Sequence, residues 1–271
     1  MRGELYRVIE QEAHVVRSCL ATGLTELRNA NLNERGRFYS AFFQLANGIE
    51  RLAKLALILD HMAQNSMSAP GQAAVRGYGH DLQRLIAMVS AAVVQRGYSL
   101  GSPFPTDPLC ARMLRFLSEF ATGMRYANLD GLASGNRQRD PLDEWNEILQ
   151  EAANLQLNSN TRRRINERAA GIATALTGFA DVLADDLAGE PLTIRTALSE
   201  PAILDAASKY MVWEVLTLLS PLRDATAEAG KAAHHIATSV VRNGERVPVL
   251  REFFDFIWLD RKYALRKKRW P

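Results

Sequence analysis

Three observations on the amino-acid sequence predict an all-α protein. Between the breakers, apolar residues recur at steps of three and four, and no long run alternates with the period of two that a strand requires. Only 17 Gly and 10 Pro occur in 271 residues, and the prolines stand at the starts of segments. A hydrophobic content of 47% suffices for a substantial core and excludes disorder for most of the chain. We therefore expect a helical bundle with further helices after it.

The first half of the chain predicts four helices. The second is the most regular, because its apolar residues follow steps of 3, 4, 3, 4 and 3 along one face. These residues are Phe42, Leu45, Ile49, Leu52, Ala56 and Leu59. A polar stripe at Ser40, Gln44, Asn47 and Arg51 gives way to a segment that is apolar nearly all round, as in the central helix of a bundle. The expected ranges are 5–28, 38–62, a short helix at 70–75, and 81–95.

Prolines mark most helix starts in the second half. Asp107 with Pro108, and Asp140 with Pro141, each form an N-cap followed by a proline at the first helical position. The first of these helices is expected to reach Tyr126. The remaining expected segments are a helix at 161–187, a connector at 189–199, a strongly apolar stretch at 201–219, a helix at 221–242 and a last helix from Pro248.

The loop at 127–140 is the best candidate for a boundary between two parts of the chain, because it combines glycines with several polar residues. It predicts a helical bundle at 1–135, a C-terminal helical region at 136–260 that packs on the bundle, and a basic tail at 261–271. A single continuous bundle is the alternative, since helix connections of this length also occur within domains.

The tail carries most of the charge asymmetry. Six of its eleven residues are basic and none is acidic, so subtracting those six charges from the net charge of +3 leaves −3 for residues 1–260. A nearly balanced body argues against a broad nucleic-acid-binding surface. The tail is expected to be flexible, or to capture nucleic acid or an acidic partner through Arg266, Lys267, Lys268 and Arg269. Its aromatic residues Tyr263 and Trp270 could stack on bases or pin the tail to the body.

Several classes of site are excluded by motif. Cys19 and Cys110 form no CxxC pair, and the five histidines form no HExxH, so no metal site and no cofactor are expected. Phosphate-cradling GxxxxGK[ST] and GxGxxG loops are absent, as is GxSxG. The N-terminal residues contain no signal-like apolar stretch, and no apolar run approaches the ~20 residues of a membrane span. We expect a cytoplasmic protein without a membrane partner.

A second basic cluster, Arg162, Arg163 and Arg164 with Arg168, lies near an expected helix start. Arginines there could bind phosphate or RNA, although their charges oppose the helix dipole. The ordinary alternative is a solvated turn. The aromatic stretch Phe253–Trp258 is likewise ambiguous, since it could be core or the contact surface of a purely structural adaptor.

Three motifs together resemble one family. They are Asn47-Gly48-Ile49-Glu50-Arg51-Leu52-Ala53-Lys54-Leu55, Tyr78-Gly79-His80-Asp81-Leu82-Gln83-Arg84-Leu85, and Arg125-Tyr126 followed by Asn128-Leu129-Asp130. In this order they resemble the HEPN class of helical proteins, over about residues 30–150. The resemblance implies an antiparallel bundle of four or five helices that commonly forms a homodimer, a place in bacterial stress or antiphage-defence modules, and an operon-encoded protein partner. In active members it implies a metal-independent RNase.

The chain departs from the active pattern, in which an arginine precedes a histidine by a polar residue and usually three more. Its nearest match, Arg76 to His80, has only three residues between and includes a glycine-rich break. We therefore expect the motif residues to form a structural polar cluster of Glu50, Lys54, His80, Asp81, Arg125 and Tyr126. An interaction, regulatory or RNA-binding role follows. The alternative is an RNase with an unusual set of Arg76, His80 and Arg125.

The residues of the cluster predict specific contacts. Glu50 and Lys54 are spaced for an i,i+4 ion pair, and His80 with Asp81 stands at a helix N-terminus. Arg125 is expected to pair with Glu50 or Asp81. We expect Glu50, Lys54, His80 and Arg125 to meet inside the bundle as a buried ionic cluster. Gly48, costly in a helix interior, predicts close approach of a neighbouring backbone.

Overall fold

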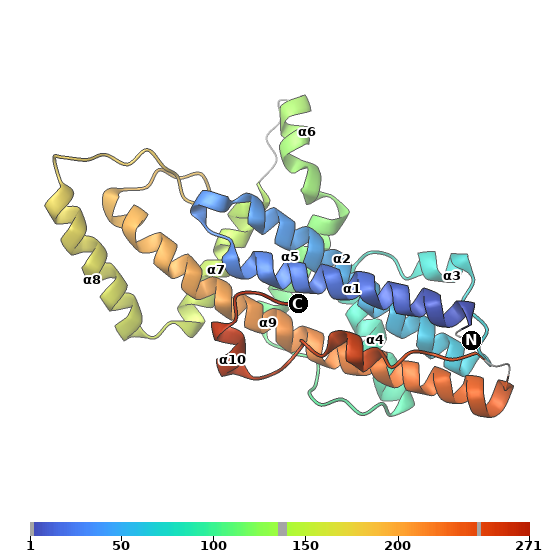
Figure 1. Cartoon of the computed structure of the whole chain (residues 1–271). Coiled ribbons are helices and arrows are strands. Elements are labelled where there is room, and N and C mark those ends of the chain that lie inside the picture. Colours follow the sequence, from blue (N-terminus) through green and yellow to red (C-terminus); the bar gives the residue numbers. More distant parts are fainter. Residues whose placement is uncertain (1–2, 135–139, 243–244) are drawn as a thin grey trace.

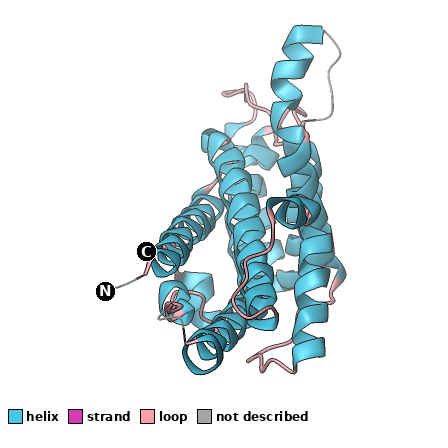
Figure 2. Cartoon of the chain, turned by 90° about the vertical axis from the view of Figure 1, so that its right-hand side faces the viewer, coloured by secondary structure: helices cyan, strands magenta, loops and turns pink. Residues whose placement is uncertain are grey.

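The computed structural model describes residues 3–134, 140–242 and 245–271, and it confirms the prediction of an all-α fold (Figure 1). Within these ranges the β-type pairing is confined to an isolated bridge between Asp185 and Pro191. In the turned view of Figure 2, helices and connecting loops account for all of the coloured ribbon.

Three long helices form the centre of the bundle. They are α1 (Glu4–Asn29), α2 (Gly36–Gln64) and α9 (Ile194–His235), and α2 packs extensively against both others. The apolar segment of α2 from Leu52 to Leu59 is almost entirely buried. The prediction that this helix is central is therefore confirmed, because only a helix covered on several sides can bury residues all round its axis.

Gly48 lets α1 and α2 approach closely. A Cβ atom at this position would lie 2.6 Å from Cδ2 of Leu20 and 3.2 Å from its backbone nitrogen. The prediction of a close backbone neighbour is confirmed. Gly23 of α1 makes the reciprocal approach, since its Cβ would lie 2.7 Å from Cγ of Leu45.

An aromatic layer joins the two halves of the chain. Phe42 of α2 lies 4.7 Å from Phe116, 5.2 Å from Phe120 and 4.8 Å from Trp145, measured between ring centroids. These rings come from α5 (Pro108–Thr122) and α7 (Pro141–Gln156). Regions on both sides of the expected boundary thus share one hydrophobic core.

Aspartates cap the helices that follow the loops. Asp107 and Asp140 accept hydrogen bonds from the backbone nitrogens of Cys110 and Leu142, as their position before proline predicted. Asp81 caps α4 (Leu82–Arg96), so this helix begins one residue after the start of the predicted range 81–95. The short helix predicted at 70–75 is α3 (Gln72–Gly77).

Four predicted boundaries in the second half are wrong. The predicted connector at 189–199 ends at residue 193, where α9 begins, and the break at Pro221 does not exist, because α9 runs through both Pro201 and Pro221 as one helix of 42 residues. A proline costs a helix interior roughly 3 kcal/mol, but the buried face of α9 continues on both sides of Pro221, with Leu219 and Leu222 fully buried. The helix then continues as a π-helix, Ile236–Val241.

The other two boundaries fail for local reasons. Helix α8 (Ser159–Leu176) ends eleven residues before the predicted Leu187, because Gly178 adopts a left-handed φ of +82° just after it. Helix α5 ends at Thr122 instead of Tyr126, because Gly123 follows it, and a 3₁₀ turn (Met124–Tyr126) leads into the projecting α6 (Ala127–Ser134). The predicted loop at 127–140 is therefore wrong over 127–134, where the chain is helical, and residues 135–139 lie outside the described ranges.

The C-terminal segment runs along the bundle instead of extending freely, which corrects the expectation of a flexible tail. The predicted helix from Pro248 is only a 3₁₀ turn (Leu250–Phe254), followed by α10 (Arg261–Arg266). Trp270 is buried, and its backbone nitrogen donates to Oγ1 of Thr25 at 2.9 Å. The second role considered for Trp270, pinning the tail, is the one the structure shows.

Candidate functional site

A polar pocket of about 570 Å³ opens between the middle of α2, the end of α5 and the approach to α4. Its polar lining comes from Gln44, Asn47, Glu50, His80, Thr122 and Arg125. Three of these residues belong to the three separate motifs of the sequence. The fold therefore brings Glu50, His80 and Arg125 to one pocket, although they are far apart in the chain.

Glu50 is the centre of the hydrogen-bonding in this pocket. Its Oε1 accepts from Nζ of Lys54 at 2.7 Å and lies 3.0 Å from Nδ1 of His80. The side chains of Glu50 and Lys54 are only 17% and 18% exposed. The predicted i,i+4 pair is thus confirmed, and it is partly shielded from water.

His80 is held at one nitrogen and open at the other. A carboxylate can only accept a hydrogen bond, so contact with Glu50 places a proton on Nδ1. In the neutral ring Nε2 then carries the lone pair, and it has no hydrogen bond with any residue that the structure describes. The His80 side chain is 70% exposed, so this nitrogen is accessible to a ligand.

Arg125 faces the same pocket but makes neither of the predicted ion pairs. Its guanidinium carbon lies 4.8 Å from the centre of the Tyr126 ring, a cation–π contact. Among the described residues it forms no ion pair with Glu50 or Asp81. Asp81 instead accepts from the backbone nitrogen of Arg84 at 3.1 Å and from Oγ of Ser118 at 3.4 Å.

The expected buried ionic cluster is therefore correct in its first three members and wrong in its burial. Glu50, Lys54 and His80 meet, but they do so at a solvent-open pocket, and Arg125 remains unpaired on its wall. Desolvating several charges costs several kcal/mol per ion, and a surface pocket avoids that cost.

Arg76 does not join this group. It lies exposed on α3, outside the lining of the pocket, and the chain turns sharply between it and His80. The backbone nitrogen of Gly79, which has a φ of +75°, donates to the Arg76 carbonyl. Of the three residues considered for an RNase, only His80 and Arg125 thus share the pocket.

Two aromatic residues of the pocket were not selected from the sequence. Phe43 is 44% exposed and its ring lies 4.9 Å from that of Phe120, edge to face. Phe43 follows Phe42, a member of the apolar stripe of α2. Whether the Phe43 ring is exposed therefore depends on the direction from which α5 packs against α2. Gln44 was recognised only as a member of a polar stripe, whereas Asn47 belongs both to that stripe and to the first of the three motifs.

The two arginine-rich segments are arranged differently from one another. Arg162 is half-buried, with Nη2 lacking a hydrogen-bond partner, Arg163 lies 3.8 Å from Glu167, and Arg164 lines a groove against α9. Consecutive helical residues point about 100° apart, so these three do not form one face. In the tail, Arg266, Lys268 and Arg269 are exposed, whereas Nζ of Lys267 donates to the Tyr263 hydroxyl at 2.7 Å.

Comparison with known proteins gives no match that indicates a function. No family model, curated protein or solved structure matches it. In the part of the chain that the structure describes, no cluster of three or more His, Cys, Asp or Glu is suited to a metal ion. Nor does any described helix combine the length and the apolar character needed to cross a bilayer.

The aromatic stretch Phe253–Trp258 is mainly core. Phe254, Phe256 and Ile257 are buried, whereas Trp258 is 64% exposed.

Proposed function

We propose that the protein binds RNA through the pocket of Glu50, His80 and Arg125, as a HEPN-like member of a bacterial stress or antiphage-defence module. The observation that carries this proposal is the unpaired guanidinium of Arg125 beside an exposed aromatic ring in one open pocket. The bacterial setting, a homodimer, a cytoplasmic location and an operon-encoded protein partner rest on the family resemblance and belong to the proposal.

The charges of the pocket favour an anion. Lys54 neutralises Glu50, which leaves Arg125 as the uncompensated charge and adds a second positive charge when His80 is protonated. A phosphodiester accepts charge-assisted hydrogen bonds from arginine, and the amides of Gln44 and Asn47 offer further donors. Phe43 presents a face on which a base can stack. This combination fits a single-stranded nucleotide better than a simple inorganic anion.

Fluorescence anisotropy with a labelled single-stranded RNA of about ten nucleotides tests the proposal. We expect Arg125→Ala to weaken binding by about tenfold or more, because a hydrogen bond to a charged group contributes about 1.5–3 kcal/mol. Phe43→Leu should weaken it by a similar factor through lost stacking. Arg115→Ala is the matched control, since Arg115 is an exposed arginine of α5 that pairs with Glu119 outside the pocket. Binding that is equally strong in Arg125→Ala and the control would refute the assignment.

A second function, metal-independent RNA cleavage, is favoured by the contact between Glu50 and His80. A histidine whose Nδ1 donates to a carboxylate is oriented to act as a base through Nε2. His80 would take the proton of a ribose 2′-hydroxyl as that oxygen bonds to phosphorus. The bond from phosphorus to the 5′ oxygen then breaks, water protonates the leaving oxygen, and Arg125 stabilises the charge of the pentacoordinate phosphorus.

Cleavage and binding are distinguished by one experiment on total RNA in the presence of EDTA. If the protein cleaves RNA, we expect fragments with 2′,3′-cyclic phosphate ends. The amount of these fragments should fall to zero in His80→Ala and decrease strongly in Glu50→Gln. Intact RNA, together with the anisotropy result above, assigns a binding role only. Cleavage that persists in His80→Ala excludes His80 as the base.

A further inference from the structure

Helix α8 stands apart from the main bundle and is covered on one side only. It packs mainly against the first turns of α9, at the left edge of the molecule in Figure 1. Of its 18 residues only Ala169 is buried. Helices in globular proteins derive most of their stability from packing an amphipathic face. An exposed helix of this length therefore has room for a further packing partner.

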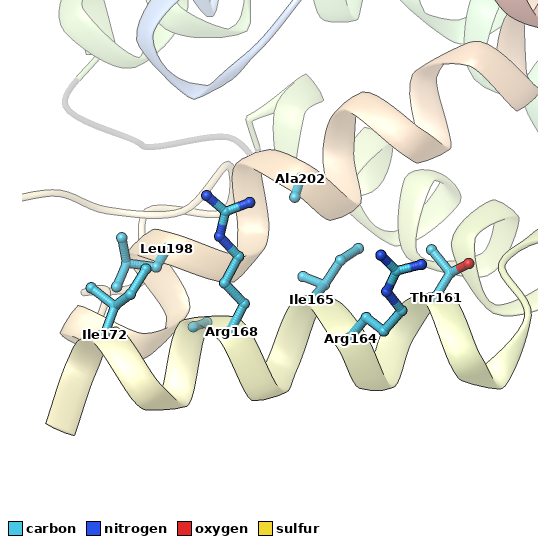
Figure 3. Close-up of a pocket in the computed structure, with 8 residues that line it drawn as sticks. Thr161, Arg164, Ile165, Arg168, Ile172, Leu198 and Ala202 are labelled. Carbon is cyan, nitrogen blue, oxygen red and sulfur yellow. The ribbon is translucent and has the colours of Figure 1, made fainter.

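The side of α8 that faces α9 is only partly closed by it and forms a groove, which we call the α8–α9 groove (Figure 3). Its volume is about 420 Å³. The floor is aliphatic and comes from Ile165, Ala169 and Ile172 of α8 with Leu198 and Ala202 of α9. Ile172 and Leu198 remain 39% and 38% exposed. Part of the floor is thus apolar surface that the described chain leaves exposed, whereas Ala169 is buried.

Two arginines stand over this floor. Arg164 and Arg168 both extend from α8 to the α9 side, one helical turn apart (Figure 3). Their side chains make no ion pair or hydrogen bond with any residue in the described ranges, and no carboxylate lines the groove. Arg163, the residue before Arg164 and outside the groove, differs because its Nε lies 3.8 Å from Oε1 of Glu167. Arg164 and Arg168 are therefore the exposed arginines of α8 that form no ion pair with a described residue.

We propose that the α8–α9 groove is the docking site for an acidic amphipathic helix of a partner protein. Four residues of rise separate the Cα atoms of Arg164 and Arg168 by about 6 Å along α8, the same rise that separates positions i and i+4 of a second helix. Each arginine offers the planar fork that binds a carboxylate at two oxygens. The aliphatic floor then receives the apolar side chains next to those carboxylates, as in other helix-in-groove complexes.

The chemistry of the groove disfavours two other occupants. Its lining contains no aromatic side chain on which a base could stack, which disfavours single-stranded RNA. A second copy of the chain, placed so that two α8 helices face each other, would bring Arg164 and Arg168 against the same arginines. Like charges across an interface cost several kcal/mol, whereas an acidic helix compensates both of them.

A synthetic peptide serves as the probe. It is a labelled amphipathic helix of about 16 residues with glutamates at i and i+4 beside leucines at helical spacing, and the control peptide replaces each glutamate by glutamine. Anisotropy with the full-length protein should show binding of the acidic peptide. We expect the double variant Arg164→Glu with Arg168→Glu to raise its Kd by about tenfold or more, because two charge pairs are lost and two repulsions are introduced.

Arg163→Glu is the matched control variant, since it makes the same charge change on the same helix outside the groove. It should alter the Kd by less than about threefold. Hydrogen exchange should slow in α8 when the peptide binds, a readout that a diffuse charge effect would not produce. If the double charge reversal unfolds α8, as circular dichroism would reveal, the pair Arg164→Gln with Arg168→Gln replaces it.

Four results would overturn the proposal. The first is no binding of the acidic peptide at low salt, and the second is an equal loss in Arg163→Glu. The third is RNA binding that depends on Arg164 and Arg168, which would assign the groove to nucleic acid. The fourth is a dimer that dissociates in the double variant, measured by sedimentation velocity, which would assign the groove to a second copy.

Discussion

Replacing Glu214 by glutamine should change the pH dependence of stability between acidic and mildly alkaline pH. Glu214 lies on α9 and is 8% exposed. Burial, reinforced by the negative charge of Asp107 and opposed by Arg261, raises the pKa of Glu214 from 4.5 to about 7. A carboxyl with a raised pKa in the folded state favours folding while it is protonated. Its contribution is fully present below about pH 4.5 and is lost as the pH rises through about 7.

The size of this effect follows from the two pKa values. A change from 4.5 to about 7 corresponds to about 3 kcal/mol between the protonated and the ionised carboxyl, as an order of magnitude. Glu214→Gln removes the ionisation and keeps the shape. Compared with the unmodified protein, it should be up to about 3 kcal/mol more stable near pH 8 and nearly equal in stability near pH 4.

Urea unfolding followed by circular dichroism across this pH range measures the difference. Glu119→Gln, an exposed glutamate of α5, is the control and should leave the difference flat. A Glu214→Gln curve that runs parallel to that of the unmodified protein at all pH values would refute the reasoning, because it would mean that Glu214 titrates normally in the fold.

Three further predictions concern packing. Gly48→Ala should destabilise the protein by about 1–3 kcal/mol in urea unfolding, although alanine ordinarily favours a helix, because the new methyl group would meet Leu20 at 2.6 Å; a gain in stability would contradict the close approach. Trp270→Ala should cost about 3 kcal/mol and expose the C-terminal residues to limited proteolysis; an unchanged cleavage pattern would contradict the role of Trp270 in holding the tail. Burial raises the pKa of the Cys110 thiol to about 12, so native protein should leave Cys110 unalkylated at neutral pH until urea is added; rapid alkylation of the folded protein would disprove its burial.

Local chemistry made part of the fold predictable. The starts of α5 and α7 follow from Asp107-Pro108 and Asp140-Pro141, because an aspartate cap and a proline at the first position act within a few residues. The central place of α2 follows from a segment with almost no polar side. In each case the determining interactions lie within one element or its immediate neighbours.

The remaining features of the fold depend on long-range packing and could not be predicted from the sequence. Pro221 is a reliable local breaker, yet α9 passes through it because Leu219 and Leu222 are buried against other helices, and the sequence does not reveal that burial. The docking of Trp270 on α1 joins residues 245 positions apart in the chain. Such contacts depend on the completed bundle, so no window of residues around the proline or the tryptophan contains them.

The candidate pocket likewise combines contacts that follow from local sequence with contacts that depend on the completed fold. The i,i+4 spacing of Glu50 and Lys54 predicts their pair, since one helix fixes both ends. The meeting of His80 with Glu50 was expected from motif resemblance, and its exposure was not. The position of Arg125 depends on how α5 ends, and the 3₁₀ turn after Gly123 directs its guanidinium over Tyr126 instead of toward Glu50.

That unpaired Arg125 is also what separates a structural role from a binding role for the pocket. A cluster that existed only to stabilise the bundle would gain from pairing Arg125 with Glu50, because the contact of Arg125 with the exposed ring of Tyr126, its neighbour in the chain, joins no two helices of the bundle. Instead, Glu50 contacts Lys54 and His80, and Arg125 faces the opening of the pocket. Arg125→Ala should therefore leave the urea midpoint within about 0.5 kcal/mol of the unmodified protein while it weakens RNA binding. A large loss of stability in this variant would instead make Arg125 a structural residue and remove the main support for the proposed function.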